Sequence, residues 1–274
     1  MIISNIKIKN FGVFKGLKEF NLKNLKGHST QAKPSINLII GPNSSGKTSF
    51  IEAIRWCLTG TISEGFTCER DDSEACSVEL TLKHGEVVYK IKRSSKRVIY
   101  PNECIPDVIT RFMFVDGNNL SSLVFMDKGS GAERNEELFD TLFQDPIKRK
   151  SHEDILNSCL PPNKHGAKGP KIKVNYNKRC IEALQDSFNM GQNDIIHYQI
   201  SLYLGIHSIL RKEREFPLFF ENIFLAMDDL IRHSVSNVFS LCDAQIFFIA
   251  LPQELPCSKI LENPDNIFRL KQKN

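Results

Sequence analysis

The chain has 274 residues, of which 41% are hydrophobic and 25% charged, a composition typical of a globular protein with a buried core. Its 36 Lys and Arg residues barely exceed its 32 Asp and Glu residues, so net charge alone does not indicate a nucleic-acid partner. No apolar run reaches the length of a membrane span, and the eight cysteines form no CxxC pair and no zinc-like spacing with histidine. A membrane partner is therefore not expected, and the scattered thiols favour a cytoplasmic protein.

Residues 1–22 alternate apolar and polar side chains on both sides of Asn10-Phe11-Gly12, which predicts two strands of an antiparallel sheet. A polar loop is expected at residues 23–34. The next stretch, residues 35–60, reads SINLIIGPNSSGKTSFIEAIRWCLTG. It predicts a buried strand, a glycine-rich loop and a helix that Gly60 closes.

The loop fits the phosphate-binding pattern G-x-x-x-x-G-K-[ST] at every fixed position. Its two glycines let the backbone turn around the phosphates, so that N–H groups and the helix N-terminus point at negative charge. Lys47 is expected to reach the β- and γ-phosphates, and the Thr48 hydroxyl to take one coordination position on Mg²⁺. The predicted nucleotide-binding residues are Gly41, Pro42, Asn43, Ser44, Ser45, Gly46, Lys47, Thr48 and Ser49.

The opening pattern I-x-x-I-x-I-x-N-F-x-x-F of residues 3–14, joined to GPNSSGKT, resembles the SMC, RecF, RecN and DndD class of ABC-type ATPase heads. The resemblance implies an α/β fold of the P-loop NTPase kind. Such a head has a mixed sheet, an antiparallel N-terminal β-subdomain and a helical C-terminal lobe. The resemblance also implies ATP and Mg²⁺ as cofactors.

Residues 61–75 are polar and acidic, and residues 76–100 alternate around two turns, which predicts a three-stranded meander. In the class just named, a meander completes the antiparallel sheet. Residues 112–115 predict a strand that leads into Asp116-Gly117-Asn118. The class has F-F-x-D-G-E there, in its Q-loop, which implies that Asn118 replaces a Glu near the metal and the γ-phosphate. A plain β-turn of the Asp-Gly type is the alternative.

Residues 133–159 show a broken helical pattern, interrupted at Asp145-Pro146. The class inserts a long coiled coil near here, but no apolar heptad extends over three repeats, and prolines and glycines at 161–170 exclude one through this linker. Basic side chains crowd residues 148–179, where they either bind DNA or form a solvated face. They are Lys148, Arg149, Lys150, Lys164, Lys168, Lys171, Lys173, Lys178 and Arg179.

A second phosphate contact is implied just before a helix expected at residues 193–211. The sequence Phe188 to Gln192 resembles the ABC signature L-S-G-G-[QE], which caps the γ-phosphate bound by the opposite head of a dimer. The resemblance places Asn189, Gly191 and Gln192 at that phosphate. Asn189 replaces the usual serine and can still donate a hydrogen bond, whereas Met190 replaces a glycine and would crowd the backbone approach.

Residues 215–222 predict a buried strand that ends in an acid and resembles a Walker B strand. The resemblance implies that Glu221 holds Mg²⁺. It also implies that Asn222 replaces the glutamate that orients or deprotonates the attacking water. Met227-Asp228-Asp229 resembles the D-loop that follows. The last strand is expected at residues 245–251, and it ends in Ala-Leu-Pro where the class has a switch histidine.

Loss of a water-orienting group costs on the order of a hundredfold or more in rate, whereas phosphate binding depends on the intact loop. We therefore predict an ATP-binding head of a DNA-associated complex in bacterial genome maintenance or anti-phage defence, with slow or partner-dependent hydrolysis. The alternative is a non-catalytic, ATP-gated assembly subunit for a nuclease or another effector. The expected organisation is an ATP-binding lobe (1–145), a basic linker (146–180) and a C-terminal lobe (181–274), acting as a homodimer or heterodimer.

Overall fold

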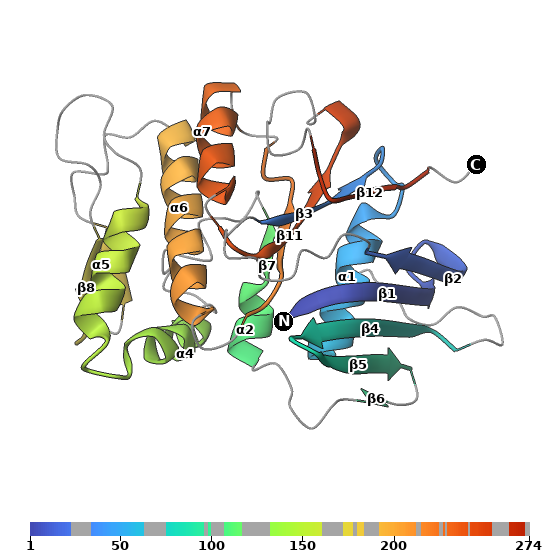
Figure 1. Ribbon diagram of the computed structural model, residues 1–274, viewed down its shortest axis with the longest axis horizontal. Coiled ribbons are helices and arrows are strands. Elements are labelled where there is room, and N and C mark those ends of the chain that lie inside the picture. Colours follow the sequence, from blue (N-terminus) through green and yellow to red (C-terminus); the bar gives the residue numbers. More distant parts are fainter. Residues whose placement is uncertain are drawn as a thin grey trace.

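The chain folds into an antiparallel sheet, a parallel sheet, a small hairpin and a helical lobe (Figure 1). The computed structural model describes residues 1–22, 34–62, 75–95, 98–99, 107–116, 132–160, 172–177, 180–183, 192–211, 215–224, 227, 229–240, 242–253 and 263–271.

The antiparallel sheet has the strand order β2-β1-β4-β5-β6. On β1, Ile6 and Ile8 are fully buried, whereas Lys7 between them is partly exposed, as expected for a strand with one face on the core. The predicted hairpin and meander are therefore confirmed as one sheet. Its strands are β1 (Ile2–Phe11), β2 (Phe14–Asn21), β4 (Ser77–His84), β5 (Val87–Ser94) and β6 (Val98–Ile99).

The parallel sheet has the order β12-β3-β11-β10-β7, and each neighbouring pair is parallel. Strands β3 and β11 are buried at every position, because the sheet is covered on both faces. The antiparallel N-terminal subdomain and the α/β class are thus confirmed, whereas the sheet expected to be mixed has only parallel pairs among its described strands. The strands are β3 (Ser35–Ile40), β7 (Phe114–Asp116), β10 (Leu218–Glu221), β11 (Gln245–Ala250) and β12 (Asn266–Arg269).

Helix α1 (Lys47–Thr59) follows β3 directly and packs against β1, β4 and β5 (Figure 1). Aromatic contacts fix its position, since Phe50 meets Phe20 edge-on with ring centroids 5.0 Å apart, and Trp56 lies 5.5 Å from Phe11. Gly60 ends the helix with φ of 81°, and its N–H donates to the Trp56 carbonyl. The helix that begins at the phosphate loop is thereby held against the antiparallel sheet.

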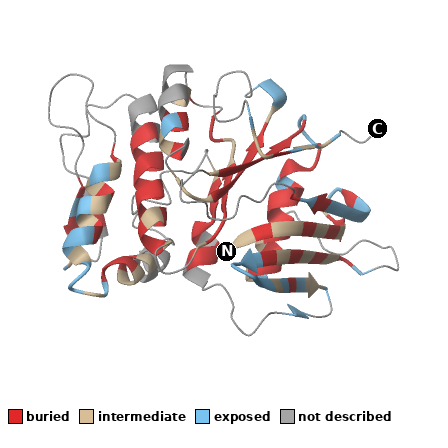
Figure 2. Cartoon of the chain, viewed as in Figure 1, coloured by how far each residue is buried: buried red, intermediate tan, exposed pale blue. Residues whose placement is uncertain are grey.

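The helical lobe consists of α4 (Ala132–Phe143), α5 (Arg149–Cys159), α6 (Gln192–Leu210), α7 (Asp229–Ser240) and the hairpin β8 (Ile172–Asn175)–β9 (Cys180–Ala183). Helix α6 packs against both α5 and α7, and Figure 2 shows its buried middle beside the exposed outer side of α5. Tyr203 of α6 stacks on Phe112, which ends the short helix α2 (Asp107–Phe112), and its hydroxyl donates to the Phe112 carbonyl. This contact ties the lobe to the segment that leads into β7.

The structure differs from the sequence-based expectations in several places. Strand β12 follows β11, so the strand predicted as the last one is not the last. Phe112 belongs to α2 and not to a strand, and part of the expected linker forms helix α5 and the β8–β9 hairpin. Cys57 and Cys242 are free thiols, but Cys76 is disulfide-bonded, so the expectation of isolated thiols is wrong there. Within the described residues, no helix combines the length and apolarity needed to cross a membrane.

Candidate nucleotide-binding site

The phosphate loop connects β3 to α1 through two backbone positions in the left-handed region, Ser44 with φ of 63° and Gly46 with φ of 101°. A side chain at Gly46 would place its Cβ 2.7 Å from Val13 and 3.2 Å from the Phe14 ring. At Gly41 a Cβ would lie 2.9 Å from the Leu270 carbonyl and closer still to the Ser45 side chain. Close packing therefore requires both glycines of the motif, and Gly46 is required by its backbone conformation as well.

The Lys47 side chain is held by backbone carbonyls of the phosphate loop. Its side chain is buried, and Nζ donates to the Gly41 carbonyl at 2.7 Å and to the Pro42 carbonyl at 2.8 Å. These bonds fix the ammonium group at the mouth of the loop, so its position is set in advance of any ligand.

Thr48 and Glu221 meet across a sequence separation of 173 residues. The Thr48 hydroxyl donates to Oε1 of Glu221 at 3.1 Å. Glu221 is the last residue of β10 and pairs in register with Asp116, the last residue of β7. The two acids lie at the carboxyl ends of neighbouring parallel strands, where ligands bind in sheets of this kind.

Burial raises the pKa of the Glu221 carboxyl, and the nearby Asp116 carboxylate adds to this increase. The hydrogen bond from Thr48 and the charge of Arg55 act in the opposite direction. A desolvated carboxylate beside a hydroxyl is a site where a cation would restore lost solvation.

Stacked aromatic rings support these strand ends. Phe114, Phe219 and Phe247 lie side by side on β7, β10 and β11, with ring centroids 4.9 and 4.6 Å apart. The guanidinium of Arg55 lies over the Phe114 ring at 5.0 Å and forms an ion pair with Glu52 on the same helix. Arg55 is a functional candidate that the sequence motifs did not reveal. The i,i+3 pair Glu52–Arg55 in the phosphate-loop helix was the signal that could have found it.

Asn222 follows Glu221 directly and adopts φ of 56°. Its N–H donates to the Ile249 carbonyl at 3.4 Å, which places it at the carboxyl end of β11. Met227 is buried, and Asp229 begins α7. Ala250, at the place where the class has a switch histidine, is a buried part of β11.

Several residues that the resemblance implies in the Q-loop, the signature and the D-loop cannot be placed against the phosphate loop. Asn118, Asn189, Gly191 and Asp228 lie outside the described residues, and Gln192 is described only as the backbone start of α6. The side chains that the structure brings together are therefore those of the phosphate loop, Glu221 and Asp116.

The described part of the basic stretch is largely paired. Lys148 lies 3.9 Å from an oxygen of Asp145, and Lys150 lies 2.9 Å from one of Asp154. Arg149 donates to the Phe143 carbonyl and lies over the Tyr176 ring at 4.8 Å. These cations remain at the surface, but their neighbouring acids reduce the positive field that a DNA strand would meet.

Comparisons with known structures find folds of the predicted kind. The SMC head bound to the C-winged helix domain of ScpA is 14% identical, with a TM-score of 0.67 over 98% of this chain and 94% of that one. RecF with a bound ATP analogue is 14% identical, with a TM-score of 0.58 over 98% and 95%. The SMC head domain from Thermotoga maritima is also 14% identical, with a TM-score of 0.55 over 94% and 93%. The predicted likeness to SMC and RecF heads is confirmed for the fold.

Sequence comparison supports the same placement. No curated protein matches the chain in sequence. Residues 5–220, which span the phosphate loop, β7 and most of β10, match the family described as AAA domain. Because this match covers more than half of the 274 residues, the chain belongs to the AAA domain family.

Proposed function

We propose that the protein is an ATP-binding head of a DNA-associated complex, with ATP hydrolysis that is slow or depends on a partner. The observation that carries this proposal is the hydrogen bond between Thr48 and Glu221. It joins the residue that ends the phosphate-binding motif to the carboxylate at the tip of a parallel strand, as Mg²⁺-dependent nucleotide binding requires.

The residues at this point fit Mg²⁺. The cation takes oxygen ligands and is usually held by one or two carboxylates together with substrate phosphates. Thr48 and Glu221 would supply the protein oxygens, with Asp116 beside them and Asn118 as a further candidate from the resemblance. The described residues contain no group of three or more His, Cys, Asp or Glu side chains that could hold a metal, so phosphate oxygens would complete the coordination. Bound there, Mg²⁺ would neutralise charge on the β- and γ-phosphates.

The loop residues would bind the phosphates before any chemistry occurs. N–H groups at the start of α1 point at the loop mouth, and the Lys47 ammonium is already fixed there. On nucleotide binding, Lys47 would exchange a carbonyl partner for a phosphate oxygen. Such a bond is stronger because both groups are charged.

Slow hydrolysis follows from Asn222. An amide does not accept a proton from an attacking water as a carboxylate does, so ATP would persist in the site. In that state Asn189, Gly191 and Gln192 would contact the γ-phosphate of a second head and close a homodimer or heterodimer. The second candidate function, a non-catalytic ATP-gated subunit that regulates a nuclease or another effector, is favoured by the same residue.

The DNA-associated role is supported by the structural relatives. RecF is described as a recombination mediator, and the SMC head as bound to a domain of ScpA. Genome maintenance or antiviral defence, in the cytoplasm, is the setting that we propose for this chain. The surface cations of residues 148–150 are the described candidates for contact with DNA.

Nucleotide binding is tested by Lys47→Ala, measured by calorimetric titration with ATP and Mg²⁺. The loss of charge-assisted bonds to two phosphates should weaken binding by at least about a hundredfold. Lys83→Ala, which removes an exposed lysine of β4, is the matched control and should bind like the wild type. Unchanged ATP affinity in a folded Lys47→Ala protein would contradict the proposal.

A further inference from the structure

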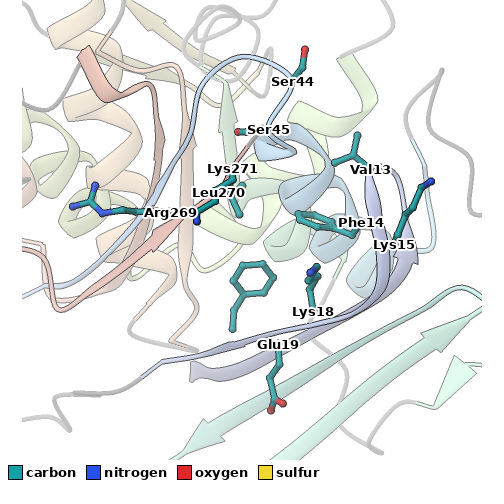
Figure 3. A pocket seen from close by; sticks show the side chains of 11 residues that line it. Val13, Phe14, Lys15, Lys18, Glu19, Ser44, Ser45, Arg269, Leu270 and Lys271 are labelled. Carbon is teal, nitrogen blue, oxygen red and sulfur yellow. The ribbon is translucent and has the colours of Figure 1, made fainter. Parts of the chain in front are cut away.

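A pocket of about 550 Å³ lies beneath the phosphate loop, between β2 and the end of β12 (Figure 3). This volume falls within the range of about 300–1,000 Å³ found for small-molecule sites. Its lining residues are Val13, Phe14, Lys15, Lys18, Glu19, Phe20, Ser44, Ser45, Arg269, Leu270 and Lys271.

The pocket is separate from the predicted metal position. Lys47, Thr48 and Glu221 are not among its lining residues. In the parallel sheet, β12 lies on one side of β3, whereas β10 and β7, which carry Glu221 and Asp116, lie on the other. A ligand in the pocket would therefore occupy the opposite side of the loop from the cation.

Lys18 stands on the core side of the sheet. It pairs directly with Ile8, and Phe20 pairs with Ile6, so these four side chains share one face. Ile6, Ile8 and Phe20 are buried, yet Lys18 is exposed. The inner face of this edge strand is thus open at Lys18, and Figure 3 shows its ammonium group below the Phe14 ring.

The pocket carries an excess of positive charge. Four of its lining residues are cationic, and Glu19 is the single acid among them. Glu19 pairs with Lys7 and accepts a hydrogen bond from Asn5, both on the opposite face of the sheet from Lys18. Figure 3 likewise shows Glu19 pointing away from the Lys18 ammonium. The acid is therefore engaged elsewhere and does not neutralise Lys18.

A buried polar atom points to the same conclusion. Ser45 is 5% exposed and lines the pocket, and its hydroxyl has no hydrogen-bond partner among the described residues. An unpaired buried hydroxyl costs free energy that a ligand oxygen could recover. Phe14, Phe20 and Leu270 form an apolar wall beside it.

We propose that this pocket is a second ligand site, which binds a phosphorylated nucleotide. Lys18 and Lys271 would bind the phosphate, the Ser45 hydroxyl would donate to it, and the apolar wall would receive the base and sugar. The same chemistry is present in a free mononucleotide and in the terminal nucleotide of a DNA strand. Because Ser45 belongs to the phosphate loop, a ligand in this pocket would change the affinity of the loop for its own nucleotide.

The experiment uses the full chain with the loop saturated by ATPγS and Mg²⁺, and ATPγS binding is measured first on the same sample. Two probes are then titrated separately: fluorescently labelled AMP, and a labelled 5′-phosphorylated oligothymidylate. Lys18→Gln and Lys271→Gln are compared with Lys90→Gln, which removes an exposed lysine of β5 away from the pocket. Failure of ATPγS to bind would contradict the proposed function. Because ATPγS binding is measured before the probes are added, that outcome is distinguished from failure of the probes to bind.

We expect at least one probe to bind alongside ATPγS. Each pocket variant should weaken it by about three- to tenfold, while Lys90→Gln should leave it unchanged. Binding of AMP would identify a free nucleotide as the ligand, and binding of the oligonucleotide alone would identify a DNA end. The proposal is overturned if neither probe binds, if ATPγS excludes both, or if a Lys18→Gln/Lys271→Gln double variant binds as tightly as the wild type.

Discussion

Asn222→Glu tests the assignment of the catalytic position, because it restores the carboxylate that the ABC class uses. If Asn222 faces the γ-phosphate, a general base there should raise ATP turnover by about a hundredfold or more. The structure also predicts a cost. Asn222 has φ of 56°, a conformation that Asn tolerates and Glu does not, so the variant should lose roughly 1 kcal/mol of stability. For a domain of this size such a loss lowers Tm by about 2–4 °C.

The assay is phosphate release at saturating ATP, with thermal unfolding measured on the same samples. Asn222→Asp is the matched control, since Asp tolerates the left-handed conformation but carries its carboxylate one methylene closer to the backbone. It should unfold at nearly the wild-type temperature and show a smaller gain in turnover. If both variants remain folded and turnover stays flat in each, Asn222 is not at the catalytic position, and the assignment of Leu218–Glu221 as a Walker B strand is wrong.

Three further changes have defined outcomes. Glu221→Gln should abolish Mg²⁺-dependent ATP binding. Burial raises the pKa of Glu221, so ionisation of its carboxyl opposes folding as pH rises. Without ligand, Glu221→Gln should therefore melt at a higher temperature than the wild type at about pH 7, but not at about pH 4. Glu86→Gln, which changes an exposed residue, should leave the melting temperature unchanged at both pH values. Burial lowers the pKa of His207 from 6.5 to about 4, so up to roughly 3 kcal/mol of the free energy of unfolding should be lost as pH falls through this interval. In His207→Gln, the free energy of unfolding from denaturant titrations should change less with pH over the same interval. Neutralising Lys148 and Lys150 together should make the slope of log DNA affinity against log salt shallower by up to about two, roughly one for each lost charge. An unchanged slope would indicate that these lysines form a solvated face.

The N-terminal half of the fold was predictable because its signals are local. Residues 1–22 alternate with a period of two, and the strand, loop and helix around Gly41 to Thr48 appear in unbroken order. The pairing of Thr48 with Glu221 was implied only through the resemblance to a known class. No local pattern joins residues that lie 173 positions apart.

Strand β12 could not be found from the sequence, because a run of four residues without alternation is too short to indicate a strand. Its place is set by distant partners. Asn266 donates to the Asn37 side chain at 2.8 Å, and the Asp265 carboxylate accepts the Ile36 N–H at 2.9 Å. Phe112 was assigned to a strand because a short apolar run is compatible with either a strand or a helix. In the structure Phe112 ends helix α2, where its ring stacks on Tyr203.

The pocket beneath the loop was equally hidden. In the sequence, Lys18 lies between Leu17 and Glu19 and stands out in no motif, whereas its pairing with Ile8 in the structure shows that it faces the core side of the sheet. Lys271 follows the strand that the sequence did not reveal. A site assembled from two sheet edges and the underside of a loop has no motif, because its residues share no fixed spacing along the chain.

The most direct test of the central claim is γ-phosphate release by the wild-type protein, with and without DNA, measured beside its affinity for ATP on the same sample. An intact phosphate loop with Asn222 in place of a carboxylate predicts clear ATP binding and turnover far below the rate of about 1 s⁻¹ or more typical of enzymes. Turnover at ordinary rates by the isolated protein, or no ATP binding at all, would contradict the account.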